Sequence, residues 1–368
     1  MTKQLCIASP NLVAYSETFI KDQVTYLEPE ILIYQGNYPV ASREEDWQLS
    51  FPFNFHIARG VSKRLAPGIF HNAYTNSLAA YLKRRNINTL LANYGTVGSS
   101  VADACAKAGV KLVVHYHGFD AYEYATLDKY KAAYQHMFRL AHTVVAVSTE
   151  MRQQLISLGA PEEKVKFIPY GINLQRFTVT DPSRNGPVLV NVGRFTPKKA
   201  PDLLIRAFKI AHDAIPEAEL RMIGAGEMHE SCKQLAAELG LSDAIKFLGI
   251  QSREEIVAHL HSARMYVQHS LRPASGDSEG TPLSILEASA CGLPVVSTRH
   301  AGIKDAIKEE ESGLLVDEGD YEEMGKAMIT LLKDPARCKQ MGEAGFRHIS
   351  AHYNFQQQAA ELKTVLLR

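Results

Sequence analysis

The chain has 368 residues, of which 46% are hydrophobic and 22% charged, a balance typical of globular proteins. Forty basic residues match forty acidic ones, so the sequence predicts no overall field that would attract nucleic acid. The length exceeds the usual size of one hydrophobic core and predicts two domains.

The five cysteines are scattered, odd in number and without metal-ligand spacing, as in proteins of a reducing compartment. The N-terminal apolar run is too short for a signal peptide, and no run of about eighteen apolar residues occurs. We therefore expect a cytoplasmic protein that does not span a membrane.

Short apolar runs alternate with helical patterns in both halves, which predicts the α/β class with two parallel, Rossmann-like sheets. The strands predicted in the first half are residues 4–8, 30–34, 89–92, 111–116, 143–147 and 166–168. Those predicted in the second half are residues 188–192, 219–223, 245–247, 265–268, 294–297 and 313–316. Pro, Gly, Ser and Asn without periodicity mark residues 176–187 as a linker between an N-terminal domain, 1–175, and a C-terminal domain, 188–350.

The first predicted strand leads into a loop with a capped helix start at Ser16 or Glu17, followed by Thr18. Ligands of parallel sheets bind beyond the carboxyl ends of the strands, so these residues could line one wall of a cleft between the domains. Simple N-capping explains Ser16 as well.

Basic residues then gather at 59–64 and 83–85, near aromatic residues that we expect to be exposed. These aromatic residues are Phe51, Phe53, Phe55 and Phe70. Such a patch suits an anionic membrane surface, where each basic residue contributes about 1 kcal/mol. A solvated helix face explains the same pattern.

The predicted strand 111–116 ends near two histidines, His115 and His117. Alternation places both on one side of the sheet, and only His117 lies at the tip, where Gly118 lets a ligand approach the backbone. A histidine in this position is either structural or catalytic. No third ligand accompanies the pair, which disfavours a metal site.

The predicted strand 188–192 ends in Gly193 and Arg194, and Lys199 follows shortly before a Pro-Asp helix start. Arginine offers a planar fork for two oxygens and lysine a compact charge, a combination that suits a diphosphate. Two surface cations covering a turn would give the same pattern.

The most informative segment runs from Glu279 to Glu287. Thr281 as N-cap, a following proline and a Gly-Leu-Pro stop predict a helix over about 282–291. The helix start offers unpaired N–H groups to a phosphate, and a carboxylate within an otherwise apolar helix is costly unless it is paired. The alternative is that Glu279 is a solvent-exposed loop residue and Glu287 a polar residue at the edge of an ordinary helix.

The sequence contains no Asp-x-Asp pair, so it shows no carboxylate clamp for a divalent metal on a nucleotide. We therefore expect Arg194, Lys199 and helix dipoles to meet the phosphate charge, with no metal or other cofactor. Gly224 and Gly226 give only a partial match to a glycine-rich phosphate loop and predict a strand-to-helix turn near the same ligand.

Taken in chain order, these motifs resemble the retaining glycosyltransferases of family 4. Each motif is weak alone, whereas five in the family's order and spacing are specific. The motifs are His117-Gly118-Phe119-Asp120, Pro169-Tyr170-Gly171-Ile172-Asn173 with Phe177, Gly193-Arg194 with Lys199, Gly224-x-Gly226, and Glu279 to Glu287. Residues 16–20 and 300–303 are similar to the colanic acid and amylovoran branch of bacterial surface-polysaccharide transferases.

The resemblance implies the GT-B fold, two Rossmann-like domains facing across a cleft. It also implies that the last helix, about 355–367 within the segment 351–368, crosses back to the N-terminal domain. The implied reaction is metal-independent, retaining transfer of a hexose from a nucleotide-diphosphate sugar, with UDP favoured and GDP possible. The implied acceptor is a glycan or a polyprenyl-linked oligosaccharide in lipopolysaccharide or exopolysaccharide synthesis.

By motif position, Glu287 would bind the donor ribose and Glu279 a hydroxyl of the donor sugar. Arg194 and Lys199 would neutralise the diphosphate, and His117 would lie beside the reacting sugar. Residues Ser16, Glu17 and Thr18 would lie on the acceptor side. The other implied donor-binding residues are Gly193, Gly226, Ile250, Gly280, Thr281, Pro282 and Leu283.

Two departures from the family pattern matter. Asn173 stands where an Asp is usual, and Thr281-Pro282 replaces an aromatic-Gly pair, so the identity of the donor does not carry over. Retention without a convincing carboxylate nucleophile predicts front-face attack, in which a leaving phosphate oxygen takes the acceptor's proton.

Two other functions remain open on the sequence. A catalytically silent nucleotide-sugar-binding module would need the phosphate site but no acceptor pocket. A GT-B nucleotide-sugar epimerase would isomerise the donor instead of transferring its sugar. A phosphorylase would need a pyridoxal-phosphate lysine, and none can be assigned.

Overall fold

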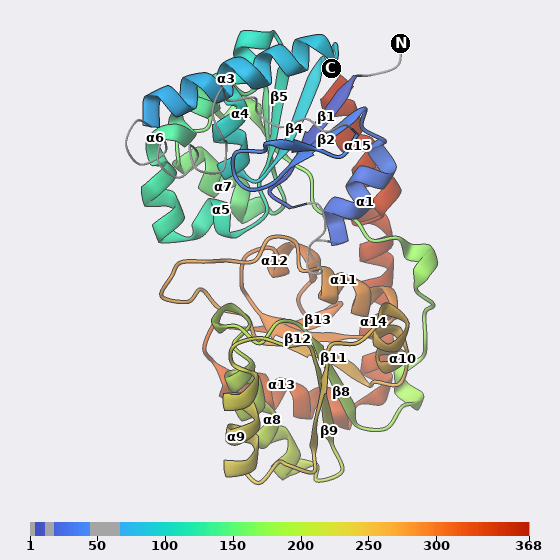
Figure 1. Ribbon diagram of the computed structural model, residues 1–368. Coiled ribbons are helices and arrows are strands. Elements are labelled where there is room, and N and C mark those ends of the chain that lie inside the picture. Colours follow the sequence, from blue (N-terminus) through green and yellow to red (C-terminus); the bar gives the residue numbers. More distant parts are fainter. Residues whose placement is uncertain (1–3, 12–17, 45–66, 368) are drawn as a thin grey trace. The chain divides into compact units, whose positions relative to one another are not determined.

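The computed structural model describes residues 4–11, 18–44 and 67–367 (Figure 1). It divides into two compact units: unit 1 is Met1–Ile168 with Ala359–Arg368, and unit 2 is Pro169–Gln358. Each unit contains its own sheet. The α/β class with two parallel sheets, predicted from the alternating pattern, is therefore confirmed.

The sheet of unit 1 has seven strands in the order β3-β2-β1-β4-β5-β6-β7. Neighbouring strands are parallel except for β3, which pairs antiparallel with β2. All six strands predicted for this half are present, whereas the two residues of β3 are too few to show a pattern. The strands are β1 (Leu5–Ala8), β2 (Ile31–Tyr34), β3 (Ala41–Ser42), β4 (Thr89–Asn93), β5 (Lys111–His115), β6 (Thr143–Ala146) and β7 (Val165–Phe167).

Helices cover both faces of this sheet. On one face, Leu27 of α1 and two leucines of the last helix, Leu362 and Leu366, join a buried cluster with apolar residues of five strands. On the other face, α4 lies so close to β5 that a Cβ on Gly98 would come within 2.7 Å of Val114. The described helices of unit 1 are α1 (Thr18–Leu27), α3 (Pro67–Arg84), α4 (Gly95–Ala108), α5 (Phe119–Tyr122), α6 (Tyr124–Leu140), α7 (Thr149–Ser157) and most of α15 (Phe355–Leu367).

The sheet of unit 2 has six parallel strands in the order β10-β9-β8-β11-β12-β13. All six were predicted, four of them with the observed bounds, because each is a short apolar run between turn signals. The strands are β8 (Val188–Val192), β9 (Glu219–Ile223), β10 (Ile245–Gly249), β11 (Met265–Gln268), β12 (Val295–Thr298) and β13 (Gly313–Val316).

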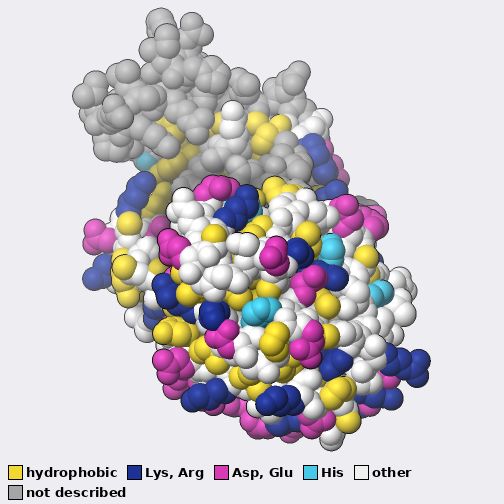
Figure 2. All heavy atoms as spheres, turned by 90° about the horizontal axis from the view of Figure 1, so that it is seen from below, with side chains coloured by type: hydrophobic (Ala, Val, Ile, Leu, Met, Phe, Trp, Pro, Cys, Tyr) yellow, Lys and Arg dark blue, Asp and Glu magenta, His cyan; other side chains and the backbone are white. Residues whose placement is uncertain are grey.

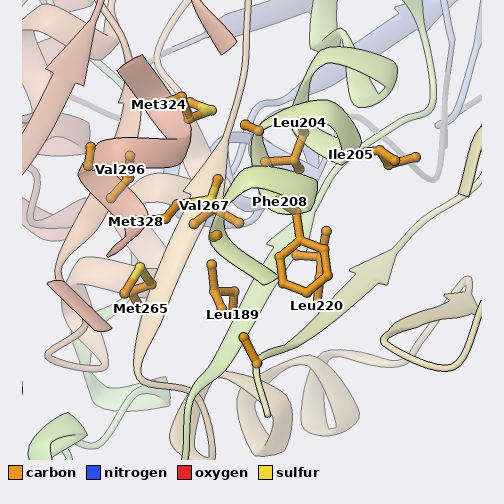
Figure 3. Close-up of a cluster of buried hydrophobic side chains, with 14 of the residues drawn as sticks. Leu189, Leu204, Ile205, Phe208, Leu220, Met265, Val267, Val296, Met324 and Met328 are labelled. Carbon is orange, nitrogen blue, oxygen red and sulfur yellow. The ribbon is translucent and has the colours of Figure 1, made fainter. Parts of the chain in front are cut away.

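Alternate strand residues of unit 2 enter two separate cores. Leu189 joins a cluster with α8, α9 and α13, part of which Figure 3 shows, whereas its neighbour Val190 joins a cluster with α10, α11 and α12. The sheet is therefore covered on both faces, and its loops are left to carry polar groups. The helices are α8 (Pro201–Ala214), α9 (His229–Glu238), α10 (Arg253–His261), α11 (Leu283–Ala290), α12 (Ile303–Ala306), α13 (Tyr321–Lys333) and α14 (Pro335–His352).

The segment predicted as a linker, 176–187, is packed on unit 2. The amide of Asn185 donates hydrogen bonds to the carbonyls of His261 and Ala263, and the backbone N–H of Thr180 donates to Cys291. The division between the units falls earlier, at Ile168. The composition correctly predicts that this segment is irregular. It does not show the long-range hydrogen bonds that attach the segment to unit 2.

The Pro169 to Asn173 motif has a structural role in unit 2. A Cβ on Gly171 would come within 2.5 Å of the backbone of Phe355, so only glycine fits there. Ile172 exchanges backbone hydrogen bonds with the turn between α14 and α15. The Asn173 side chain accepts from the N–H of Gln175 and caps a short 3-10 turn.

One surface prediction is wrong: Phe70, expected to be exposed beside the basic residues, is 2% exposed and packs against Tyr38 and Tyr74. It lies on the inner face of α3. Lys83 and Arg84 at the end of α3 are exposed, while residues 51–64 lie outside the described residues. None of the described helices has the length and apolar character that a membrane span requires.

Basic and acidic side chains are interspersed on the face shown in Figure 2. Several of the basic residues of unit 2 are paired at its surface, for example Arg299 with Glu309 and Asp317, and Arg337 with Glu310. The balanced composition is therefore also a balanced distribution on this face.

Candidate active site

The loops after β8 and β9 touch each other through backbone atoms. Gly224, with φ of 136°, faces Gly193, and a Cβ there would lie 2.0 Å from the carbonyl oxygen of Gly193. A Cβ on Gly226 would lie 2.4 Å from the carbonyl oxygen of Phe195. The partial glycine motif thus allows two loops to pack together, which places the Gly193-Arg194 turn.

Replacing Gly224 with alanine is expected to lower the free energy of unfolding by about 3 kcal/mol or more, because the added methyl group clashes with backbone that cannot move aside. Urea unfolding measures the loss. Gly186→Ala is the matched control: it has ordinary φ and open space around its Cβ, and we expect little change. Equal stability of the two variants would contradict the packing described for Gly224.

Two neighbouring lysines in the loop between β8 and α8 reach the segment before α11. The Nζ atom of Lys199 lies 2.9 Å from Oε1 of Glu279. The Nζ atom of Lys198 lies 2.9 Å from Oδ2 of Asp277 and donates to the carbonyl of Ser278. Three consecutive residues, 277–279, are therefore held by cations from one turn.

Glu279 is buried, with 8% of its surface exposed. Burial alone would raise the pKa of its carboxyl group, but the charges of Lys199 and Lys198 lower it to about 2. Oε1 receives no hydrogen bond of good geometry from the described residues, although it lies within ion-pair distance of Lys199. Glu279 is thus an ionised carboxylate that can still accept a hydrogen bond from a hydroxyl group.

The side chain of Arg194, by contrast, is exposed and makes no hydrogen bond or ion pair with any described residue. Arg194 follows Gly193. The aliphatic part of the Lys199 side chain packs over Gly193 and lies 3.8 Å from where a Cβ on that glycine would be. Of the two predicted phosphate cations, Lys199 is committed to Glu279 and Arg194 is available to a ligand.

Helix α11 begins one residue later than predicted, and Thr281 is not its N-cap. Pro282 occupies the N-cap position, and the Thr281 hydroxyl instead accepts a hydrogen bond from the backbone N–H of Tyr170. The tertiary contact takes the side chain away from the helix. The N–H groups of Leu283 and Ser284 belong to the first turn, where the helix itself supplies no acceptor.

A polar network lies against the start of α11. The Tyr266 hydroxyl lies 2.9 Å from the Ser284 hydroxyl and 2.9 Å from Oε1 of Gln268, and it donates or accepts according to its rotation. Glu287 is half-buried on the same helix. Burial and then the charge of Glu287 raise the pKa of the Cys291 thiol to about 12, so that cysteine is not a nucleophile.

Ile250 follows β10 and is 61% exposed, a large apolar residue in the turn after Gly249. An exposed isoleucine at a strand end offers an apolar surface to a flat ligand. It is the one predicted donor-binding residue of unit 2 whose side chain is both apolar and largely exposed among those described.

In unit 1, His117 is buried beside His115, with ring centroids 4.5 Å apart. Its Nε2 lies 3.0 Å from Oδ1 of Asn93, which fixes Nε2–H as the donor. Burial and then the charge of His115 hold the pKa of His117 well below its usual value, so the ring is neutral. The alternation argument placed both histidines correctly on one side of the sheet.

Asp120 of the same motif holds the turn that follows. Its carboxylate accepts hydrogen bonds from the backbone N–H groups of Gly95, His117 and Gly118 at 2.9, 3.0 and 2.9 Å. Burial raises the pKa of Asp120 to about 6 against the lowering effect of these bonds. Asp120 therefore ties the end of β5 to the start of α4 and orients the backbone of His117.

The predicted site residues thus fall into three groups. Gly193, Arg194, Lys199, Gly226 and the residues from Glu279 to Glu287 gather at the carboxyl ends of the strands of unit 2, with Ile250 in the loop after β10. His117 lies in unit 1. Ser16 and Glu17 lie outside the described residues, and Thr18 begins α1.

Sequence reasoning missed several contributors. Lys198 was passed over because its neighbour Lys199 fits the family motif, and Asp277 and Glu318 carry no motif of their own. His300 lies in the segment 300–303 that resembles the family branch, but sequence reasoning assigned it no role. Among the described residues, no group of three His, Cys, Asp or Glu side chains could hold a metal ion.

Two family models match this chain. The model described as "Glycosyltransferase Family 4" matches residues 27–176, and the model described as "Glycosyl transferases group 1" matches residues 177–348. Together they follow unit 1 and unit 2 closely.

Among bacterial relatives, the amylovoran biosynthesis glycosyltransferase AmsK of Erwinia amylovora is 31% identical over 77% of this chain and 69% of its own. The putative colanic acid biosynthesis glycosyltransferase WcaL of Escherichia coli is 29% identical over 63% of this chain, and the match spans 58% of WcaL. A GDP-mannose-dependent phosphatidylinositol monomannoside mannosyltransferase of Mycolicibacterium smegmatis is 28% identical over 71% of each chain.

The crystal structure of Anabaena HepE in complex with UDP covers 99% of both chains with a TM-score of 0.77. Its sequence identity to this chain is 17%, so the likeness concerns the fold. Both Rossmann-like units and their order in the chain are shared over this length.

Proposed function

This chain belongs to the family 4 glycosyltransferases, and from that premise we propose that it moves a hexose-type sugar from a nucleotide-diphosphate sugar to a glycan or lipid-linked oligosaccharide in surface-polysaccharide synthesis. The observation that carries the proposal is the buried, ionised Glu279 paired with Lys199 before α11, together with the exposed Arg194 in the loop that carries Lys199.

Charge builds on the diphosphate as the bond to the anomeric carbon breaks, so the leaving oxygens need cations. Arg194 supplies a fork of donors that no described residue occupies, and Lys199 adds a charge held in place by Glu279. At an intermediate dielectric, opposite charges 4 Å apart attract by about 4 kcal/mol. We assign the N–H groups at the start of α11 to the same phosphates.

Glu279 accepts a hydrogen bond from a hydroxyl of the donor sugar, and Glu287 from the ribose. Gly193, Gly226 and Gly280 to Leu283 contribute backbone contacts. Ile250 offers its exposed side chain to the base. From unit 1, the neutral ring of His117 is assigned to a hydroxyl of the transferred sugar, since only a neutral imidazole accepts a hydrogen bond.

Retention follows if the acceptor attacks from the side of the leaving group and a phosphate oxygen takes its proton. No metal enters this scheme, because the cations named above meet the phosphate charge. We favour a UDP-sugar, supported by the UDP named with HepE, and keep a GDP-sugar as the alternative, supported by the GDP-mannose-dependent relative.

The acceptor suggests a place of action at the cytoplasmic side of a membrane, with peripheral contact through unit 1. Exposed Lys83 and Arg84 are the described residues that support this contact. Flotation with vesicles of anionic or neutral lipid tests it: binding to the anionic vesicles alone is expected, and equal failure on both would overturn it.

Incubation with a panel of UDP- and GDP-sugars and a lipid-linked acceptor tests the function, with EDTA present in a parallel series. Nucleotide release with acceptor elongation is expected, unaffected by EDTA. An isomerised donor would indicate an epimerase, and tight binding without turnover a binding module; either result would overturn transfer. Loss of activity in EDTA would overturn metal independence, and an inverted anomeric product would overturn retention.

A further inference from the structure

A buried histidine in unit 2 holds the backbone of Glu279 and has no role in the scheme above. His300 follows β12 and is 1% exposed. Its Nε2 lies 3.2 Å from the backbone N of Glu279 and 3.2 Å from the hydroxyl of Ser278. A backbone N–H can only donate, so Nε2 must be the acceptor.

The other ring nitrogen fixes this tautomer. Nδ1 of His300 lies 2.6 Å from Oε1 of Glu318, a carboxylate that accepts, so Nδ1 carries the proton. Oε2 of Glu318 accepts from the backbone N–H of Arg272 at 2.9 Å. Glu318 is therefore held at both oxygens and orients the ring of His300 toward Glu279.

Backbone geometry supports the same arrangement. Ala301, directly after His300, has φ of 42°, a left-handed conformation that costs a non-glycine residue energy. The loop after β13, which contains Glu318, is also held in place. Nε2 of His269 accepts a hydrogen bond from the backbone N–H of Gly319, the neighbour of Glu318. Burial lowers the pKa of His269 to about 4, so it is neutral and can accept.

The contacts converge because of the sheet order. His269, His300 and Glu318 follow β11, β12 and β13, which are neighbours in the sheet, so their carboxyl ends lie at one edge (Figure 1). Lys198 and Lys199 approach the segment 277–279 from the loop after β8. The lysines hold its carboxylates and one carbonyl, and His300 holds its backbone N–H.

We propose that His300, oriented by Glu318, is a positioning residue that sets the direction of the Glu279 carboxylate toward the donor sugar. This inference rests on the proposed function of Glu279. His300 does not contact the reacting atoms and acts through the Glu279 backbone. A misplacement of about 1 Å at a catalytic group can lower turnover by about 100-fold.

Two substitutions separate the contacts of the ring. His300→Gln places an oxygen near the position of Nε2 and can still accept from Glu279 N–H. His300→Asn keeps a donor near Nδ1 for Glu318 but leaves no acceptor in reach of Glu279. We expect His300→Asn and His300→Ala to lower kcat for transfer by about 10- to 100-fold, and His300→Gln to restore most of it.

The affinity for the nucleoside diphosphate alone separates a local effect from general misfolding, because misfolding would weaken this affinity as well. We expect Kd for UDP or GDP, whichever the wild type binds, to stay within about threefold in all three variants. Hydrogen exchange at the Glu279 amide should quicken in His300→Asn and His300→Ala and stay slow in His300→Gln.

The outcomes distinguish the inference from the proposed function. A wild-type protein that turns over no donor overturns the proposed function and the role of His300 in turnover with it. Wild-type transfer accompanied by equal kcat in His300→Asn and His300→Gln overturns the inference alone. Loss of nucleotide binding in His300→Asn would also overturn it, because His300 would then support the fold of the site.

Discussion

Replacing Arg194 with alanine is expected to lower kcat by about 100- to 1000-fold, the range seen when one charge-stabilising donor is removed from an active site. Arg194 is the exposed cation of the proposed diphosphate site, and its side chain makes no hydrogen bond or ion pair with a described residue. Its loss should therefore leave the free energy of unfolding within about 0.5 kcal/mol of wild type. Initial rates at saturating donor and urea unfolding measure the two quantities.

Arg184→Ala is the matched control for Arg194→Ala. Arg184 also lies in unit 2, its side chain is 85% exposed, and its guanidinium group lies 3.5 Å from the carboxylate of Asp181. Arg194→Lys keeps the charge and loses the planar fork, so it should recover only part of the rate. Turnover of Arg194→Ala within twofold of wild type would remove Arg194 from the mechanism.

Replacing Lys199 with methionine is expected to lower both turnover and stability, because it leaves the Glu279 carboxylate buried beside only a more distant cation. The lowering of the Glu279 pKa from 4.5 to about 2 corresponds to about 3 kcal/mol of stability at pH 7. Lys199 is the nearest source of that lowering. We expect the free energy of unfolding to fall by up to about that amount, because Lys198 and His300 also lower this pKa.

The stability that ionised Glu279 contributes depends on pH, and its lowered pKa sets the direction of that dependence. Glu279 has a lower pKa in the folded protein, so its contribution is complete above pH 4.5 and is lost as the pH falls toward 2. The stability difference between wild type and Lys199→Met should therefore be largest at neutral pH and shrink below about pH 4. Urea unfolding at a series of pH values measures it, and a difference independent of pH would contradict the ion pair.

A double substitution isolates the pair. Glu279→Gln in the Lys199→Met background removes the uncompensated charge, so the double variant should be more stable than Lys199→Met alone. It should still be inactive, because the carboxylate for the donor sugar is gone. Glu279→Gln alone should lose turnover with a smaller loss of stability.

The strands were the elements that the sequence predicted most reliably. All twelve predicted strands are present because a buried strand between helices must be a short apolar run, whatever its neighbours in space. The two-residue strand β3 was missed, since two residues carry no periodicity.

Two predictions were wrong because the side chain concerned packs or bonds with residues that lie far from it in the sequence. The Thr281 hydroxyl, predicted as a helix cap, accepts from Tyr170, which lies 111 positions earlier in the chain. Phe70 was expected at the surface because of its basic neighbours in sequence, and it lies on the inner face of α3. In both cases the sequence pattern is compatible with two environments, and packing chooses one.

The sequence by itself determined the fold class and the family and named most residues of the proposed phosphate site, because strand periodicity and motif spacing are local properties of the chain. Only the tertiary structure decided how charge is distributed there. It pairs Lys199 with Glu279, leaves Arg194 for a ligand and brings His300 and Glu318 to the Glu279 backbone. The physical reason is that ion pairs and hydrogen bonds depend on distances in space, which neighbouring strand ends create between residues far apart in the chain.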